Sequence, residues 1–136
     1  EKKIDNLLVD ENFELGFQNL DFLYFGSVIQ YISDYEKIIN SFKKIKPKYV
    51  IVSQTPFFDS NNNDNNIIVK QINLHPVINF LYIINLNLFM NFMKNNNYIL
   101  ISKNISRVIK FINFKNFKKR FKKIDMYDLL FKHNEE

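Results

Sequence analysis

Two groups of polar and aromatic residues follow apolar runs in this sequence, and their side chains suit ligand binding. The first group is Gly26, Ser27, Gln30 and Tyr31, directly after the apolar run Leu20–Phe25. The second is Thr55-Pro56-Phe57-Phe58-Asp59, after the apolar run Tyr49–Val52. If both runs are parallel strands, the two groups lie at carboxyl ends, where α/β folds place ligands. A carboxylate there, Asp59, could act as a base or orient a nucleophile.

Each of these residues also has a structural interpretation. Gly26 and Ser27 could simply turn the chain, with Tyr31 packing against the domain. For Asp59 we favour a turn, because Pro, Asp, Ser and Asn are common turn formers. Gln71 lies on an expected strand and either hydrogen-bonds a substrate or faces water. His75 precedes Pro76, and we favour a loop residue over a general base.

The elements that must position these residues form a βαβ unit. The run Leu20–Phe25 predicts a buried strand. Ser33, with Glu36 three residues on, predicts a capping box at the start of a helix over Asp34–Lys46. Apolar residues at spacings of three and four give that helix one apolar face; they are Tyr35, Ile38, Ile39, Phe42 and Ile45. Pro47 ends it, and Tyr49–Val52 predicts a parallel second strand.

Further elements are expected along the rest of the chain. They are a strand over Ile67–Ile72, a helix over Leu86–Asn95 capped by Asn85, a strand over Tyr98–Ser102 and a last strand over Met126–Phe131. The apolar stretch Val77–Met93 is interrupted by four asparagines. It is shorter than the ~20 apolar residues that a membrane span needs, so we interpret it as core material.

Composition narrows the class of protein. The 136 residues suit one domain over 1–136. There is no cysteine and there are only two histidines, which argues against disulfides, a thiolate zinc site or a histidine-rich metal site. Asn, Ile, Lys and Phe dominate, as in products of AT-rich genomes, so residue abundance carries little weight. No secretory signal is visible, and we expect a soluble, cytoplasmic protein.

The motifs themselves resemble a known family. Asp21-Phe22-Leu23-Tyr24-Phe25-Gly26-Ser27-Val28-Ile29-Gln30-Tyr31-Ile32, then Pro47-Lys48-Tyr49-Val50-Ile51-Val52 and Thr55-Pro56-Phe57, resemble a bacterial family of class I, Rossmann-like methyltransferases that use S-adenosylmethionine. The resemblance covers about residues 20 to 132. It implies that Gly26, Ser27, Gln30 and Tyr31 line the cofactor side, and that Thr55, Phe57 and Gln71 line the substrate side. It identifies no catalytic base and no metal, and the methyl acceptor is expected to be a small molecule or glycan.

The resemblance also implies a fold. The chain would be the C-terminal half of the sheet, with the family's strands in the order 4-5-7-6, the last strand in sequence antiparallel, and flanking helices. Ser53-Gln54 stands where the family has Asp-Arg, and no G-x-G motif occurs. The Gly-rich cofactor turn and the ribose-binding acid would therefore precede Glu1. We expect the chain alone to be inactive, and its open apolar edge Phe22–Phe25 to favour self-association.

An alternative function rests on a basic stretch. Lys103–Lys123 holds nine basic residues and no acid, whereas the other residues hold ten basic and fourteen acidic side chains, so the net charge of +5 is local. Phenylalanines recur among the lysines, at Phe111, Phe114, Phe117 and Phe121. The alternative is a non-enzymatic α/β interaction module that binds an anionic surface through Lys118, Lys119, Lys122 and Lys123. A solvated lysine face, without nucleic-acid binding, is the favoured interpretation of this stretch.

Overall fold

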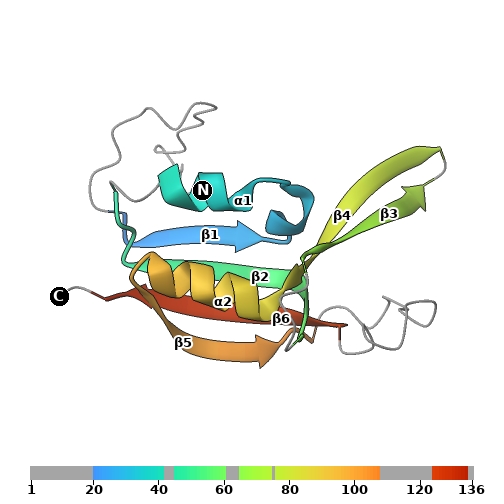
Figure 1. The fold of residues 1–136 in the computed structure, drawn as a ribbon. Helices are drawn as coiled ribbons and strands as arrows, with labels where there is room; N and C mark the ends of the chain where they lie inside the picture. Colours follow the sequence, from blue (N-terminus) through green and yellow to red (C-terminus); the bar gives the residue numbers. More distant parts are fainter. Residues whose placement is uncertain (1–19, 42–44, 61–64, 75, 108–123, 135–136) are drawn as a thin grey trace, which may run out of the picture.

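A computed structural model of the chain describes residues 20–41, 45–60, 65–74, 76–107 and 124–134 (Figure 1). The fold is α/β, with one mixed six-stranded sheet and two α-helices in the described residues. The elements are β1 (Phe22–Gly26), the 3-10 turn η1 (Ile29–Tyr31), α1 (Tyr35–Ser41), β2 (Tyr49–Phe58), β3 (Ile67–Leu74), β4 (Val77–Asn85), α2 (Leu86–Asn95), β5 (Tyr98–Ile105) and β6 (Ile124–His133).

The strands β1, β2, β6 and β5 lie side by side in that order. β1 and β2 are parallel, with Leu23 opposite Val50. β6 is antiparallel to both β2 and β5, with Leu130 opposite Ile51 on one side and Ser102 on the other. The predictions that the first two strands are parallel neighbours and that the last strand is inserted antiparallel are confirmed. The ladder extends β5 and β6 beyond their predicted ends.

A hairpin of β3 and β4 projects from the sheet (Figure 1). β4 joins β2 only at its end, where Ile84 lies opposite Phe57. The interpretation of Val77–Met93 as core material is therefore wrong for residues 77–80, where Val77, Ile78 and Phe80 are exposed, whereas Leu81, Ile83 and Ile84 are buried. Only the end of β4 lies against the sheet, and the rest is paired with β3 alone.

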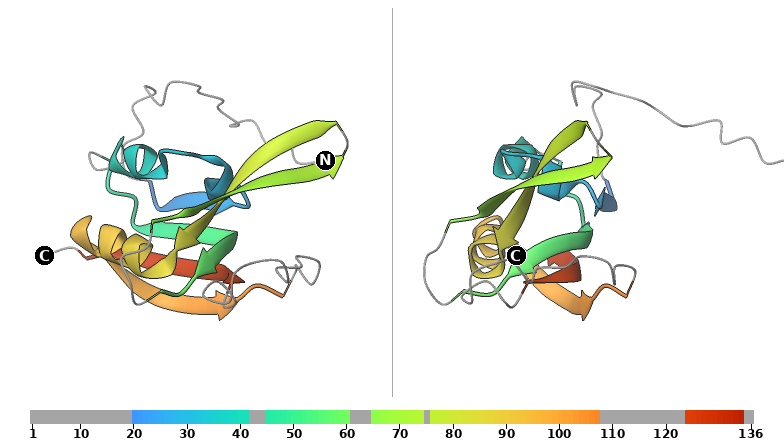
Figure 2. Two further views of the ribbon diagram at one scale, coloured as in Figure 1. Left: turned by 45° about the vertical axis from the view of Figure 1, so that its right-hand side comes forward. Right: turned by 90° about the vertical axis from the view of Figure 1, so that its right-hand side faces the viewer.

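Both helices cover the same face of the sheet (Figure 2). Alternate residues of the strands, such as Phe25, Val50 and Leu129, point into a core that α1 and α2 close with Ile39 and Phe89. Every second residue along these strands thus faces the core, as expected for a sheet that helices cover on one face only. In the part of the chain that the structure describes, no helix covers the other face, and Phe22 and Tyr24 of β1 are exposed there.

The helix starts differ from prediction in one case. The Asp34 carboxylate accepts a hydrogen bond from the Lys37 N–H at 3.2 Å, so Asp34 caps α1 in place of the predicted Ser33. The described helix ends at Ser41, and residues 42–44 lie outside the description. The cap at Asn85 is confirmed, because its side chain accepts from the N–H groups of Asn87 and Leu88. Neither described helix is long and apolar enough to cross a membrane.

Candidate functional site

At the edge of the sheet where β1 ends, its last residue lies beside the middle of β2, which continues past Ser53 to Phe58. Gly26 lies opposite Ser53, and the Ser27 N–H donates to the Ser53 carbonyl at 3.0 Å. This contact ties Ser27 of the first group to β2 just before the second group, which begins at Thr55. The edge is the place where open α/β sheets bind ligands.

Two residues at this edge adopt the left-handed backbone conformation. Ser27 and Gln54 both have φ of 52°, and the β2–β6 register shifts between Val52 and Thr55, which marks a bulge around Gln54. The left-handed conformation costs a non-glycine residue roughly 1–2 kcal/mol. Gly26 does not adopt it, so the sharp turn falls one residue later than the sequence suggested.

A carboxylate on β6 holds the bulge in place. Asp128 accepts a hydrogen bond from the Ser53 hydroxyl at 2.9 Å and from the Gln54 N–H at 2.8 Å. Hydrogen bonds to a charged acceptor are stronger than neutral ones. Asp128 therefore offsets the backbone strain at Gln54.

The Gln54 side chain and carbonyl then position the segment after β1. Gln54 Oε1 accepts from the Ser27 hydroxyl at 2.9 Å, and the Gln54 carbonyl accepts from Gln30 Nε2 at 3.5 Å. The Thr55 hydroxyl donates to Gln30 Oε1 at 3.4 Å. Gln30 and Thr55 are buried. We call these six residues the rim network: Ser27, Gln30, Ser53, Gln54, Thr55 and Asp128.

The side chains of the rim network differ in what they offer a ligand. Gln30 and Thr55 bind each other and are closed off from solvent, so they position neighbours. Ser27 is partly accessible, and Tyr31 is 45% exposed. Of the residues predicted on the cofactor side, Ser27 and Tyr31 are thus the ones whose side chains a ligand can reach.

Phe57 belongs to the hydrophobic core. Its side chain is fully buried, with ring centroids 5.3 Å from Phe89 and 6.2 Å from Tyr127. Asp59 is exposed and accepts from the Asn87 amide at 3.3 Å, near the start of α2. Burial, followed by the nearby Asp125 and Asp59 carboxylates, raises the pKa of Tyr127. The Asp59 contact suits its structural interpretation as a turn residue that supports α2.

Gln71 lies away from the rim network. It pairs with Asn79 in the hairpin, while its neighbour Lys70 pairs with Phe80. Directly opposed residues share a face of an antiparallel pair, so Gln71 and Phe80 lie on opposite faces. Gln71 Oε1 is buried and has no hydrogen-bond partner among the described residues.

A groove lies between η1 and β4, beside the rim network. It has a volume of about 570 Å³. Its lining residues are Tyr31, Ser33, Ile78, Asn79, Phe80 and Tyr82. Tyr31 thus links the carboxyl edge of the sheet to the projecting hairpin.

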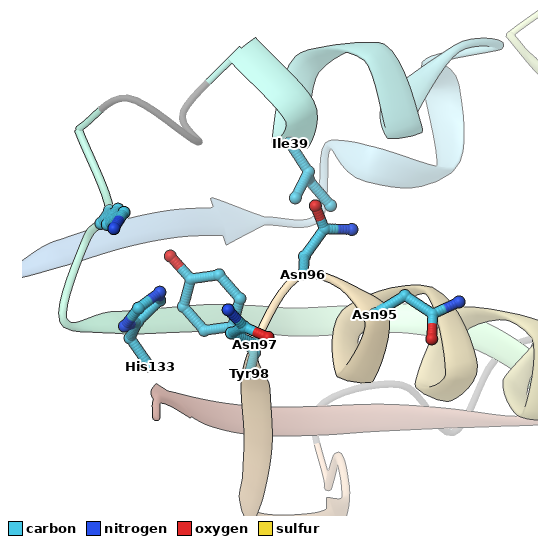
Figure 3. A pocket seen from close by; sticks show the side chains of 7 residues that line it. Ile39, Asn95, Asn96, Asn97, Tyr98 and His133 are labelled. Atoms are coloured by element: carbon cyan, nitrogen blue, oxygen red, sulfur yellow. The ribbon is translucent and has the colours of Figure 1, made fainter. Parts of the chain in front are cut away.

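A second cavity, of about 230 Å³, lies at the opposite end of the sheet (Figure 3). Its lining residues are Ile39, Lys46, Asn95, Asn96, Asn97, Tyr98 and His133. The Tyr98 hydroxyl donates to the Pro47 carbonyl at 2.9 Å, and its ring meets His133 edge to face. Burial raises the pKa of Tyr98 to about 12. These contacts join the starts of β2 and β5 to the end of β6, which is a structural role.

Several predicted residues lie outside the described part of the chain. They are His75 and the stretch 108–123, with Lys118, Lys119, Lys122 and Lys123. Sequence reasoning also missed Gln54 and Asp128 as members of the site. A glutamine seldom signals a left-handed turn, and the only hint of Asp128 was its place in the last strand.

Comparison with models of known families finds no match, and comparison with curated proteins finds none either.

Proposed function

We propose that this chain is the C-terminal part of a class I methyltransferase that uses S-adenosylmethionine. One observation carries the proposal. The strands β1, β2, β6 and β5 are neighbours in that order, and β6 alone among them runs in the direction opposite to the other three. This is the order 4-5-7-6 that the resemblance of the motifs implies. The rim network, at the point where β1 ends beside β2, supports the same proposal.

The roles of the residues follow from their accessibility. The cofactor supplies an activated methyl group to an attacking nucleophile of the acceptor. Ser27 and Tyr31 contact the cofactor, since their side chains are accessible. Gln30 and Thr55 hold the segment that carries them, and Phe57 supports it from the core. Positioning and exclusion of water are the chain's contribution to rate.

The residues present fit one wall of a cofactor site. Ser27 at the end of β1 offers a hydroxyl, and the turn after Gly26 brings backbone close to the edge. No G-x-G turn of the kind that such sites use occurs in the 136 residues, and the resemblance implies that the ribose-binding acid precedes Glu1. We therefore propose that this chain is inactive alone, and that the outer edge of β1 pairs with another strand or with a second copy.

Photo-crosslinking tests the proposal at the residue level. Labelled S-adenosylmethionine is irradiated with the protein extended by the codons upstream of Glu1, and the labelled peptide is mapped. The proposal predicts label on the peptide that carries Gly26–Tyr31, competed by S-adenosylhomocysteine. Label confined to peptides outside residues 20–60, or label that S-adenosylhomocysteine does not compete, contradicts it. A Tyr31→Ala variant should lose most of the label, whereas the exposed Tyr24→Ala should keep it.

The alternative function depends on residues 108–123, outside the described part of the chain. It predicts that replacing Lys118, Lys119, Lys122 and Lys123 by Gln weakens binding to anionic vesicles, with a strong dependence on salt. Equal binding by both proteins excludes it. The upstream reading frame separates the two functions: a G-x-G after an apolar strand supports the enzyme, and a start codon just before Glu1 supports the module.

A further inference from the structure

The groove between η1 and β4 has a lining that restricts what it can bind. Its side chains are the phenols of Tyr31 and Tyr82, the Ser33 hydroxyl, the Phe80 ring and Ile78, with Asn79 between them in the strand. No carboxylate, ammonium, guanidinium or imidazole group is among these described lining residues. Lys70 lies opposite Phe80 in the hairpin but does not line the groove.

Three hydroxyl groups of this lining are free to bind a ligand. The hydroxyls of Tyr31, Ser33 and Tyr82 make no hydrogen bond to any residue in the described ranges. Each can both donate and accept a hydrogen bond. A purely hydrocarbon ligand would bury these groups unpaired, which costs about 1–3 kcal/mol for each group.

The rest of the lining offers flat apolar surface. Ile78, Phe80 and Tyr82 alternate along β4, so their side chains share one face of the hairpin. Phe80 is 60% exposed and Ile78 47% exposed. Exposed aromatic rings next to hydroxyl groups suit a ligand with an apolar ring face and polar edges. The described lining residues hold no counter-ion for a charged ligand.

We propose that this groove binds an uncharged ring that carries hydroxyl groups. A neutral pyranose and an aromatic alcohol share this chemistry. The apolar face of the ring stacks on Phe80 and Tyr82, and its hydroxyl groups pair with Tyr31 and Ser33. Because Tyr31 also belongs to the predicted cofactor side, this ring is the methyl acceptor; that last step rests on the proposed function, whereas the binding itself does not.

Ligand-observed NMR with the 136-residue chain tests the binding. The neutral probes are methyl β-glucopyranoside and catechol, and the charged probes are glucose 6-phosphate and glucosamine. We expect one neutral probe to bind in about the millimolar range, which is ordinary for a ligand of this size. The charged probes should bind at least about tenfold more weakly. Comparison of the glucoside with catechol shows whether the groove binds a neutral pyranose or an aromatic alcohol.

Variants locate the binding. Phe80→Ala should weaken binding of the probe about tenfold by removing a stacking ring, and Tyr31→Phe or Ser33→Ala should weaken it by roughly threefold to tenfold through one lost hydrogen bond. Tyr24→Phe is the matched control, because Tyr24 is 63% exposed on β1 and outside the groove. Circular dichroism confirms that each variant is folded.

Three outcomes overturn the inference. They are equal or tighter binding of the charged probes, an affinity that Phe80→Ala and Tyr31→Phe leave unchanged, and no binding of either neutral probe. The proposed function is tested separately by cofactor binding to the extended protein. If a neutral probe binds but the cofactor does not, the groove is a ring-binding site and the proposed methyltransferase function is contradicted. If the cofactor binds but neither neutral probe does, the proposed function is supported and the inference about the groove is contradicted.

Discussion

The Asp128 carboxylate of β6 accepts a hydrogen bond from the Gln54 N–H of β2 at 2.8 Å, across 74 positions of sequence. Gln54 is left-handed, and its side chain in turn accepts from Ser27, which is also left-handed. β6 therefore stabilises, through Gln54 of β2, the backbone conformation of the turn that follows β1 at the candidate site. Removing Asp128 disturbs that edge without touching the ligand.

Asp128→Ala should lower the free energy of unfolding by about 2 kcal/mol. It removes hydrogen bonds from the Ser53 hydroxyl and the Gln54 N–H to a partly buried carboxylate. Urea denaturation measures the loss. Asp21→Ala is the control, since the exposed Asp21 side chain makes no hydrogen bond within the described residues. Equal stability of the two variants would show that Asp128 does not hold the bulge.

Local patterns were enough to predict β1, α2 and the first part of β2; the loop expected from Gln54 is wrong, because β2 continues to Phe58. Each of these elements has a run or regular spacing of apolar residues next to a residue that starts or ends an element, such as Asn85 before α2 or Pro47 before β2. β4 was missed because its apolar run continues into α2 without a Gly or Pro between them. The helix cap at Asp34 was assigned to its neighbour Ser33, because both residue types cap helices.

The site was harder to predict than the strands. The sequence predicts Gln30 and Thr55 as ligand-binding residues. In the structure these two residues, 25 positions apart, hydrogen-bond each other and both are buried. Neither the bulge at Gln54 nor its support by Asp128 has a local signature. Pairings of this kind depend on strand register, which becomes known only when the strands are placed beside each other.

Replacing Asn97 by Gly should stabilise the fold by up to about 1 kcal/mol. Asn97 has φ of 63° and follows Asn96, the C-cap of α2; at this position glycine avoids the cost of a left-handed side chain. Asn95→Gly, two residues earlier and still in the helix, should instead destabilise by about 1 kcal/mol or less. Thermal denaturation compares the two. The same sign for both substitutions would contradict the assigned end of α2.

Asn85→Ala should lower the free energy of unfolding by about 1–2 kcal/mol. Its side chain accepts hydrogen bonds from the N–H groups of Asn87 at 3.0 Å and Leu88 at 3.3 Å, and loss of such a cap has this cost. Asn91→Ala, at an exposed position inside α2, should be neutral or slightly stabilising because Ala favours helix. Urea denaturation of both variants tests the cap, and an equal loss at the two positions would argue against it.

Stability should fall as the pH rises from about 10 to about 12. The Tyr98 phenol has an ordinary pKa of about 10 in the unfolded chain, whereas burial raises its pKa to about 12 in the fold. Above about pH 10 the unfolded chain therefore loses this proton first, and ionisation favours unfolding. Below that pH the contribution is fully present.

The comparison with Tyr98→Phe isolates this phenol. Urea denaturation at about pH 9 and about pH 11 should show a smaller fall in stability for the variant than for the parent chain. Tyr98→Phe is also less stable at about pH 9, because the hydrogen bond to the Pro47 carbonyl is lost. The same pH dependence in both proteins would contradict burial as the cause of the raised pKa.

Isothermal titration of S-adenosylhomocysteine tests the central claim most directly. The ligand is titrated into the 136-residue chain and into the protein extended by its upstream codons. We expect no measurable binding by the 136-residue chain, because one wall of the site lacks preorganised partners, and micromolar binding by the extended protein. Micromolar binding by the 136-residue chain alone, or none by the extended protein, would contradict it.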